Sequence, residues 1–221
     1  STRDDGSALV RREALQLVAR NADANAIALL ARTARNDAND ETRMAAVEWL
    51  SRVGNDAAYA AVEELMRTST DERVQTAAAR GMARSDSPRA QTTVRALVER
   101  RDVSERLRMS IISSMASHGN TPTEYWRSLY GKVESDELRR AIVSAVNRES
   151  DDGMQFLLGV ARGANEPSSV RAAAISRVRQ TAPIAELYRL FETADSRGVR
   201  LSIVAGLASR KEPEATDRLI D

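Results

Sequence analysis

The sequence predicts an all-α fold made of repeated helix pairs, and three observations support this prediction. A capping residue followed by apolar residues at helical spacing occurs seven times, about 32 residues apart. A period of this length corresponds to one helix-turn-helix unit. Alanine dominates the apolar residues and aromatic residues make up only 4% of the chain, which suits helices that pack closely in stacked pairs. No proline falls well inside a proposed helix.

The segment 135–148 shows the repeated pattern most clearly. Ser135 is a good N-cap residue, and the two acids after it complement the positive end of the helix dipole. The apolar residues that follow have the spacing of one helical face, and they are Leu138, Ile142, Val143 and Val146. The segment therefore predicts an amphipathic helix.

Seven such helices can be aligned on the residue three positions after the cap. The caps are Ser7, Asn39, Asp71, Ser104, Ser135, Pro167 and Ser196, of which only Pro167 is a poor N-cap residue. The aligned residues, apolar in all copies but the second, are Val10, Thr42, Val74, Leu107, Leu138, Val170 and Val199. The residues five and eight positions further on are apolar in every copy, so we expect them in the core. The residues directly after the aligned position are Arg11, Arg43, Gln75, Arg108, Arg139, Arg171 and Arg200.

A second, weaker series of apolar residues lies between these helices and predicts one partner helix for each unit. Its members again have helical spacing, and they include Ile27, Leu30 and Ala34; Tyr59, Val62 and Met66; Val94 and Val98; Trp126 and Tyr130; Met154, Leu157 and Ala161; Ile184, Leu187 and Phe191. Starts are marked by Asn55-Asp56, Ser87-Pro88, Thr121-Pro122, Asp151-Asp152 and Ala182-Pro183. Each unit thus has a first helix and a second, arginine-bearing helix.

With these patterns the chain resembles bacterial HEAT-repeat proteins of the short HEAT-like, PBS-lyase type, whose repeats read LL-x-x-A…D-x-x-V-R-x-x-A-x-x-A-L. The clearest matches are residues 29–47 and 160–175. The resemblance implies a right-handed α-solenoid (superhelix) of about six to seven stacked helix-turn-helix repeats. It also implies that the second helices line the concave side and that the recurrent arginine bonds to loop groups of neighbouring repeats.

One such solenoid is expected over residues 1–221. Residues 7–20 have the pattern of a second helix without a first helix before it, and residues 212–221 that of a first helix without a second after it. Because solenoids need polar capping repeats at their ends, we expect a fragment of a longer repeat region, or ends that a partner covers. The alternative is that both ends simply fray.

The composition gives little support for catalysis or for a metal or cofactor site. His118 is the only histidine, cysteine is absent, and the ten glycines are scattered singly, so neither a zinc site nor a glycine-rich phosphate loop is expected. The chain has 33 basic and 32 acidic residues and no apolar run long enough for a membrane span. We therefore expect no catalytic residue, no metal, no cofactor and no membrane insertion.

The exposed positions of the second helices are the candidate binding surface. Most are small and neutral, and those singled out as a partner-binding stripe are Arg12, Met44, Glu48, Arg80, Met109, Arg140, Arg179 and Leu201. Small residues leave room for a helix or extended peptide, and methionine adapts to apolar partners. The expected partner is a protein or peptide, and so sparse a set of arginines disfavours nucleic acid. The alternative is that small residues are present only because tight stacking favours them.

Two other functions follow from the resemblance alone. HEAT-like proteins include chromophore lyases of phycobiliproteins, for which Tyr59, Trp126 and Tyr130 would have to line a pigment pocket, and DNA glycosylases with a strongly basic groove. The absence of cysteine fits the cytoplasm and also an exported protein, and the arginine-rich, lysine-poor composition is typical of a GC-rich bacterial genome. The sequence leaves the partner and the oligomeric state open.

Overall fold

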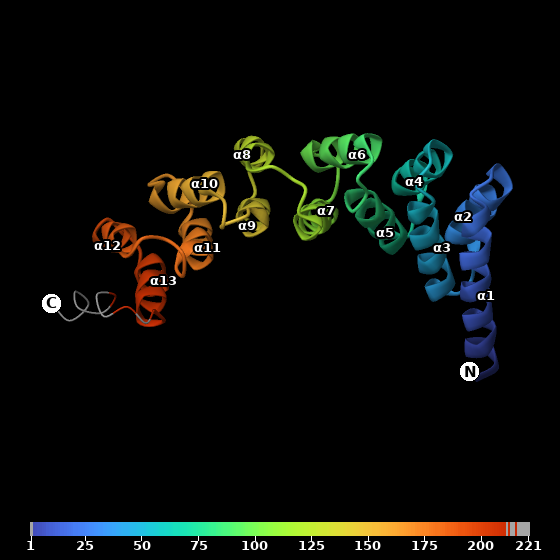
Figure 1. The fold of residues 1–221 in the computed structure, drawn as a ribbon, viewed down its shortest axis with the longest axis horizontal. Coiled ribbons are helices and arrows are strands. Elements are labelled where there is room, and N and C mark those ends of the chain that lie inside the picture. Colours follow the sequence, from blue (N-terminus) through green and yellow to red (C-terminus); the bar gives the residue numbers. More distant parts are fainter. Residues whose placement is uncertain (1, 211, 213–214, 216–221) are drawn as a thin grey trace. The chain divides into compact units, whose positions relative to one another are not determined.

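The structure, a computed structural model, describes residues 2–210, 212 and 215, and this part of the chain is helical with short connections (Figure 1). The expected all-α fold is confirmed. The helices are α1 (Thr2–Asn21), α2 (Ala24–Asn36), α3 (Asp40–Val53), α4 (Asp56–Thr68), α5 (Glu72–Ala83), α6 (Pro88–Glu99), α7 (Glu105–His118), α8 (Thr123–Lys132), α9 (Asp136–Ala145), α10 (Asp151–Arg162), α11 (Ser168–Val178), α12 (Ile184–Glu192) and α13 (Arg197–Ala208).

The helices after α1 form the expected pairs, in which each even-numbered first helix packs against the odd-numbered second helix that follows it. Contacts divide the chain into two compact units, Ser1–His118 and Gly119–Asp221. In the first unit α1, α3, α5 and α7 contact one another in order, and α2 contacts α4. In the second unit α9, α11 and α13 contact one another in order, and α8 contacts α10. Each unit is therefore a stack of helix pairs with the second helices in one row.

Side-chain caps explain where many of the helices begin. Asn39, Ser135 and Ser196 accept a hydrogen bond from the backbone N–H three residues later, and Asp71 accepts one from Arg73. Pro167 is the N-cap of α11 without a side-chain bond, as its lack of a polar group requires. Gly54 ends α3 in a left-handed conformation with φ 70°, which glycine adopts without strain.

Two helix ends differ from the expectation. Ser7 does not cap a helix, because α1 begins at Thr2 and the hydroxyl of Ser7 accepts a hydrogen bond from Arg11 instead. No proline lies between Thr2 and Ser7, so the helix can begin before Ser7. Helix α9 ends at Ala145, earlier than the pattern over 135–148 predicts, and Val146 is its C-cap. The predicted first helix over 212–221 lies outside the described residues, apart from positions 212 and 215.

The core consists of the two predicted apolar columns of the second helices. Leu50, Met82, Ile112 and Ile175 are among those that are fully buried. Only Val18 and Val204 of these columns are half-buried. The apolar residues of the first helices pack against them, which confirms the predicted helix pairs.

Helix α1 differs from the other second helices. Val10 is 69% exposed, whereas its equivalents in the other repeats are all buried. Leu9 and Leu17 on the same helix are 57% and 62% exposed. The other second helices cover this face with the first helix of their own pair, and α1 has no such partner among the described residues.

Candidate binding groove and arginine ladder

The recurrent arginine of the second helices bonds to the end of the first helix in its own pair. Six of the seven column residues donate a hydrogen bond to a backbone carbonyl: Arg43 to Asp37 (2.8 Å), Gln75 to Ser69 (2.8 Å), Arg108 to Val98 (2.6 Å), Arg139 to Val133 (3.3 Å), Arg171 to Ala161 (3.3 Å) and Arg200 to Ala194 (3.0 Å). The last carbonyls of a helix have no partner within it, so these side chains satisfy them. The arginine is therefore structural, as the family resemblance implies, but these carbonyls belong to its own repeat and not to a neighbouring one.

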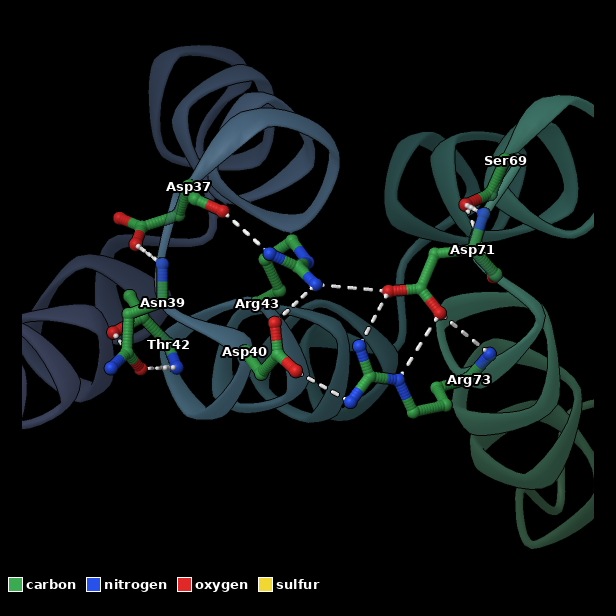
Figure 2. Close-up of polar contacts among 8 residues, drawn as sticks. All are labelled: Asp37, Asn39, Asp40, Thr42, Arg43, Ser69, Asp71 and Arg73. Carbon is green, nitrogen blue, oxygen red and sulfur yellow. Dashed lines mark hydrogen bonds and ion pairs between the residues drawn. The ribbon is translucent and has the colours of Figure 1, made fainter.

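The same residues also tie one repeat to the next, as Figure 2 shows for Arg43. Its guanidinium lies 3.0 Å from Asp71, the N-cap of α5, and 2.5 Å from Asp40 on its own helix. Arg73 pairs with the same two carboxylates, at 2.5 Å from Asp40 and 3.4 Å from Asp71. The backbone N–H of Arg73, together with the two guanidiniums, lowers the pKa of Asp71 to about 2.

These carbonyl bonds and inter-repeat ion pairs, here called the arginine ladder, continue in the second unit. Arg139 lies 3.2 Å from Glu166 of the next repeat, and Arg171 lies 2.6 Å from Asp195. Arg171 is 4% exposed, and its buried guanidinium is satisfied by the carbonyl of Ala161 and by the more exposed Asp195. The column arginines are therefore occupied by structural contacts and are poor candidates for ligand binding.

A groove of about 940 Å³ opens on the row of second helices in the first unit. Its walls come mainly from α3, α5 and α7, and Tyr59 of α4 also lines it. It is lined by Met44, Glu48, Ser51, Arg52, Gly54, Tyr59, Ala77, Arg80, Gly81, Arg84, Ser85, Ser113, Ser114 and Ser117. Three residues of the predicted stripe, Met44, Glu48 and Arg80, are thus brought together in one groove.

Two of the lining residues, Ser51 and Gly81, lie where α3 and α5 pack closely. A Cβ atom on Gly81 of α5 would lie 2.2 Å from Oγ of Ser51 on α3, so only glycine permits the two helices to approach this closely. The hydroxyls of Ser51, Ser114 and Ser117 donate to backbone carbonyls of their own helices, at 2.9 Å in each case. Their oxygens are therefore left as hydrogen-bond acceptors toward the groove.

The groove carries more positive than negative charge. Glu48 is the one carboxylate among its lining residues, and it pairs with Arg52 at 2.7 Å. The side chains of Arg80 and Arg84 are exposed and make no hydrogen bond or ion pair in the described part of the chain. Two uncompensated cations thus lie four residues apart at the C-terminal end of α5, Arg80 in its last turn and Arg84 as its C-cap.

The remaining stripe residues are not gathered in this groove. Arg12 pairs with Glu41 at 3.1 Å, and Met109 is half-buried on α7 outside the lining. The other three belong to the second unit: Arg140 pairs with Glu137 at 3.1 Å, Arg179 lies half-buried at the end of α11, and Leu201 is 57% exposed on α13. The sequence pattern did not indicate which arginines have partners, because those partners come from neighbouring repeats or turns.

The aromatic residues considered for a pigment pocket are part of the core. Tyr59, Trp126 and Tyr130 are 5%, 1% and 8% exposed, and Tyr59 belongs to the first unit whereas the others belong to the second. Tyr130 donates a hydrogen bond of 2.7 Å to Glu166, and burial, together with this bond, raises the pKa of the tyrosine. Packing accounts for all three side chains.

His118 contacts a carboxylate rather than a nucleophile. Its Nε2 lies 2.8 Å from Asp86, in the connection between α5 and α6. Among the described residues, no three side chains of the metal-binding types form a group that could hold an ion. No helix in this part of the chain is both long and apolar enough to cross a bilayer.

Comparison with known proteins supports the family and gives no specific activity. Residues 2–83 match the family model for HEAT repeats, and no curated protein matches the chain. Human deoxyhypusine hydroxylase in complex with glycerol is a similar structure, with 16% identity, a TM-score of 0.43, and coverage of 93% of this chain and 80% of that one. The complex of CpcE and CpcF of phycocyanin lyase from Nostoc is another, with 14% identity, a TM-score of 0.37, and coverage of 95% and 86%.

Likenesses at this level of identity and TM-score say nothing about activity. The family match covers α1 to α5. The same helix pairs, carbonyl bonds and inter-repeat ion pairs continue through α13. Residues 2–83 therefore belong to the HEAT-repeat family, and the later helix pairs of the described chain have the same architecture.

Proposed function

We propose that this protein is a non-enzymatic scaffold that binds a protein or peptide segment in the groove of its first unit. The observation that carries the proposal is the composition of that groove. Serine, alanine and glycine residues leave space between three adjacent second helices. Met44 offers apolar contact, and Arg80 and Arg84 have no side-chain partner in the described chain. The structural arginines lie outside the groove, so a ligand would not have to break the repeat stack to bind.

The groove is also suited to binding without rearrangement. Its walls are helices whose ends are fixed by caps and by the arginine ladder. A preformed surface loses little conformational entropy on association, so affinity does not have to offset folding of the binding site. Alanine and serine at a surface between helices admit the close approach of a backbone, as peptide recognition in a helical groove requires.

Site-specific photo-crosslinking in cells of the source organism tests the proposal. A photoreactive residue is placed at Ser113, exposed in the groove, and at Ala57, exposed on the first helix α4, as the control. The proposal expects one protein, identified by mass spectrometry, that crosslinks from position 113 and not from position 57. Equal yields at both positions, or crosslinks to nucleic acid, would contradict it.

A further inference from the structure

Arg80 and Arg84 give the groove a chemical preference. Arg80 lies in the last turn of α5 and Arg84, four residues later, is the C-cap of that helix; both side chains are exposed and line the groove. Like charges at this spacing repel, and no carboxylate in the described chain pairs with either. An anionic ligand would remove this repulsion. We propose that the groove selects an acidic polypeptide segment, with Arg80 and Arg84 as anchors for two of its carboxylates; this inference rests on the proposed function.

Neighbouring arginines show what the chain does where it neutralises its own cations. Arg35 pairs with Glu64 at 3.0 Å, and Arg89 pairs with Glu63 at 2.9 Å, both between first helices. Arg52 lies in the groove itself and is paired with Glu48. Arg80 and Arg84 lie beside the second helices of two neighbouring repeats, but the one carboxylate that these helices place in the groove lining, Glu48, pairs with Arg52 instead.

The spacing of the two cations suits a polypeptide. Four residues of α-helix rise about 6 Å, which is close to the separation of two carboxylates at i and i+4 on a bound acidic helix. The serine oxygens in the walls act as acceptors, as their hydroxyl protons are given to backbone carbonyls. They can therefore receive N–H groups from a peptide. Met44 adds one apolar contact for a small side chain.

Nucleic acid fits the same groove less well. Tight binding to phosphates requires several neutralised charges, typically six to ten contacts, whereas the groove has two uncompensated arginines and a wall that contains Glu48. Tyr59, the one aromatic residue in the lining, is buried, and its hydroxyl is bonded to Ser85 at 2.6 Å. It therefore offers no open ring face on which a base could stack.

The test measures binding of fluorescent peptides by anisotropy to the full chain. One peptide is an alanine-based helix with glutamates at i and i+4, and a second has glutamine at those positions. The test variant is Arg80→Gln with Arg84→Gln. The control is Arg32→Gln with Arg67→Gln, which removes the same charge from exposed positions of α2 and α4. Circular dichroism checks that both variants keep their helices.

We expect the glutamate peptide to bind the parent chain and the control alike, and the test variant roughly tenfold or more weakly. Equal binding of the glutamine peptide, an equal loss in the control, no binding of the glutamate peptide at millimolar concentration, or tighter binding of a single-stranded oligonucleotide would each overturn the inference. The proposed function is judged separately. A crosslink from Ser113 that persists in the test variant would reject the acidic preference and leave the scaffold function in place, whereas equal crosslinks from Ala57 would reject the function itself.

Discussion

Replacement of Arg43 tests whether the repeats are held by carbonyl bonds or by ion pairs. Its side chain is 14% exposed, and it donates to the carbonyl of Asp37 at 2.8 Å. It also pairs with Asp40 and Asp71, but Arg73 contacts both of those carboxylates (Figure 2). Loss of Arg43 therefore leaves each carboxylate with a cation, and leaves the carbonyl of Asp37 without its donor. The carbonyl bond should dominate the effect.

The chain contains its own control for this argument, because Gln75 occupies the equivalent position one repeat later. Its amide donates to the carbonyl of Ser69 at 2.8 Å, also six residues earlier in the sequence. Arg43→Gln can keep such a bond, whereas Arg43→Met cannot. A hydrogen bond from a charged donor contributes about 1.5–3 kcal/mol, so we expect Arg43→Met to lose about 2–3 kcal/mol. We expect Arg43→Gln to retain about 1 kcal/mol of that amount.

Urea unfolding followed by circular dichroism gives both values. Hydrogen exchange at the end of α2 adds a local measurement, since the amides near Asp37 should lose protection in Arg43→Met and keep most of it in Arg43→Gln. Equal destabilisation by the two variants would refute the dominant role of the carbonyl bond. A loss in both that disappears in 1 M salt would assign the effect to the ion pairs instead.

Further predictions concern packing and pH. Gly81→Ala should lower the free energy of unfolding in urea by about 1–3 kcal/mol, because its Cβ would meet Ser51 at 2.2 Å. Gly159→Ala, on α10 with nothing within 4 Å of the new Cβ, should raise it by about 0.5–1 kcal/mol. A loss of stability in both variants would contradict the packing argument. The pKa of Asp71 is lowered to about 2 in the folded state, from an ordinary value of 3.8, so its contribution is present above pH 4 and is lost as the pH falls from 4 to 2. Thermal unfolding in the parent chain and in Asp71→Asn should therefore differ at pH 6 and converge near pH 2, and a constant difference would refute the assignment.

The sequence predicted the features that repeat and missed those that depend on neighbours. The apolar columns place Leu50 and Ile112 in the core because helical periodicity alone decides which face of a helix is buried. The sequence did not predict that Arg12 is paired while Arg80 is not, since a partner such as Glu41 lies on another helix and is identified only once the helices are stacked. Arg84 lies ten residues after the aligned residue of its repeat, Val74, as Arg52 does after Thr42. This recurrent spacing was the sequence signal that could have singled out Arg84.

Other features could not be read from a periodic pattern. The extension of α1 to Thr2 depends on residues that lack the apolar face used to find the helices. The close approach at Gly81 requires the distance between α3 and α5, which the sequence does not give. A single continuous solenoid over residues 1–221 and the stripe across both units stay predictions, because the structure is described as two separate units.

The central claim is that the groove of the first unit binds a protein segment. Calorimetric titration with the partner protein that the crosslink from Ser113 identifies tests it most directly. The matched variants are Met44→Glu, which alters the groove lining, and Met109→Glu, which lies outside that lining. Both variants should keep the helicity of the parent chain. The account predicts that Met44→Glu abolishes measurable binding while Met109→Glu retains the affinity of the parent chain. Unchanged affinity in Met44→Glu would contradict it.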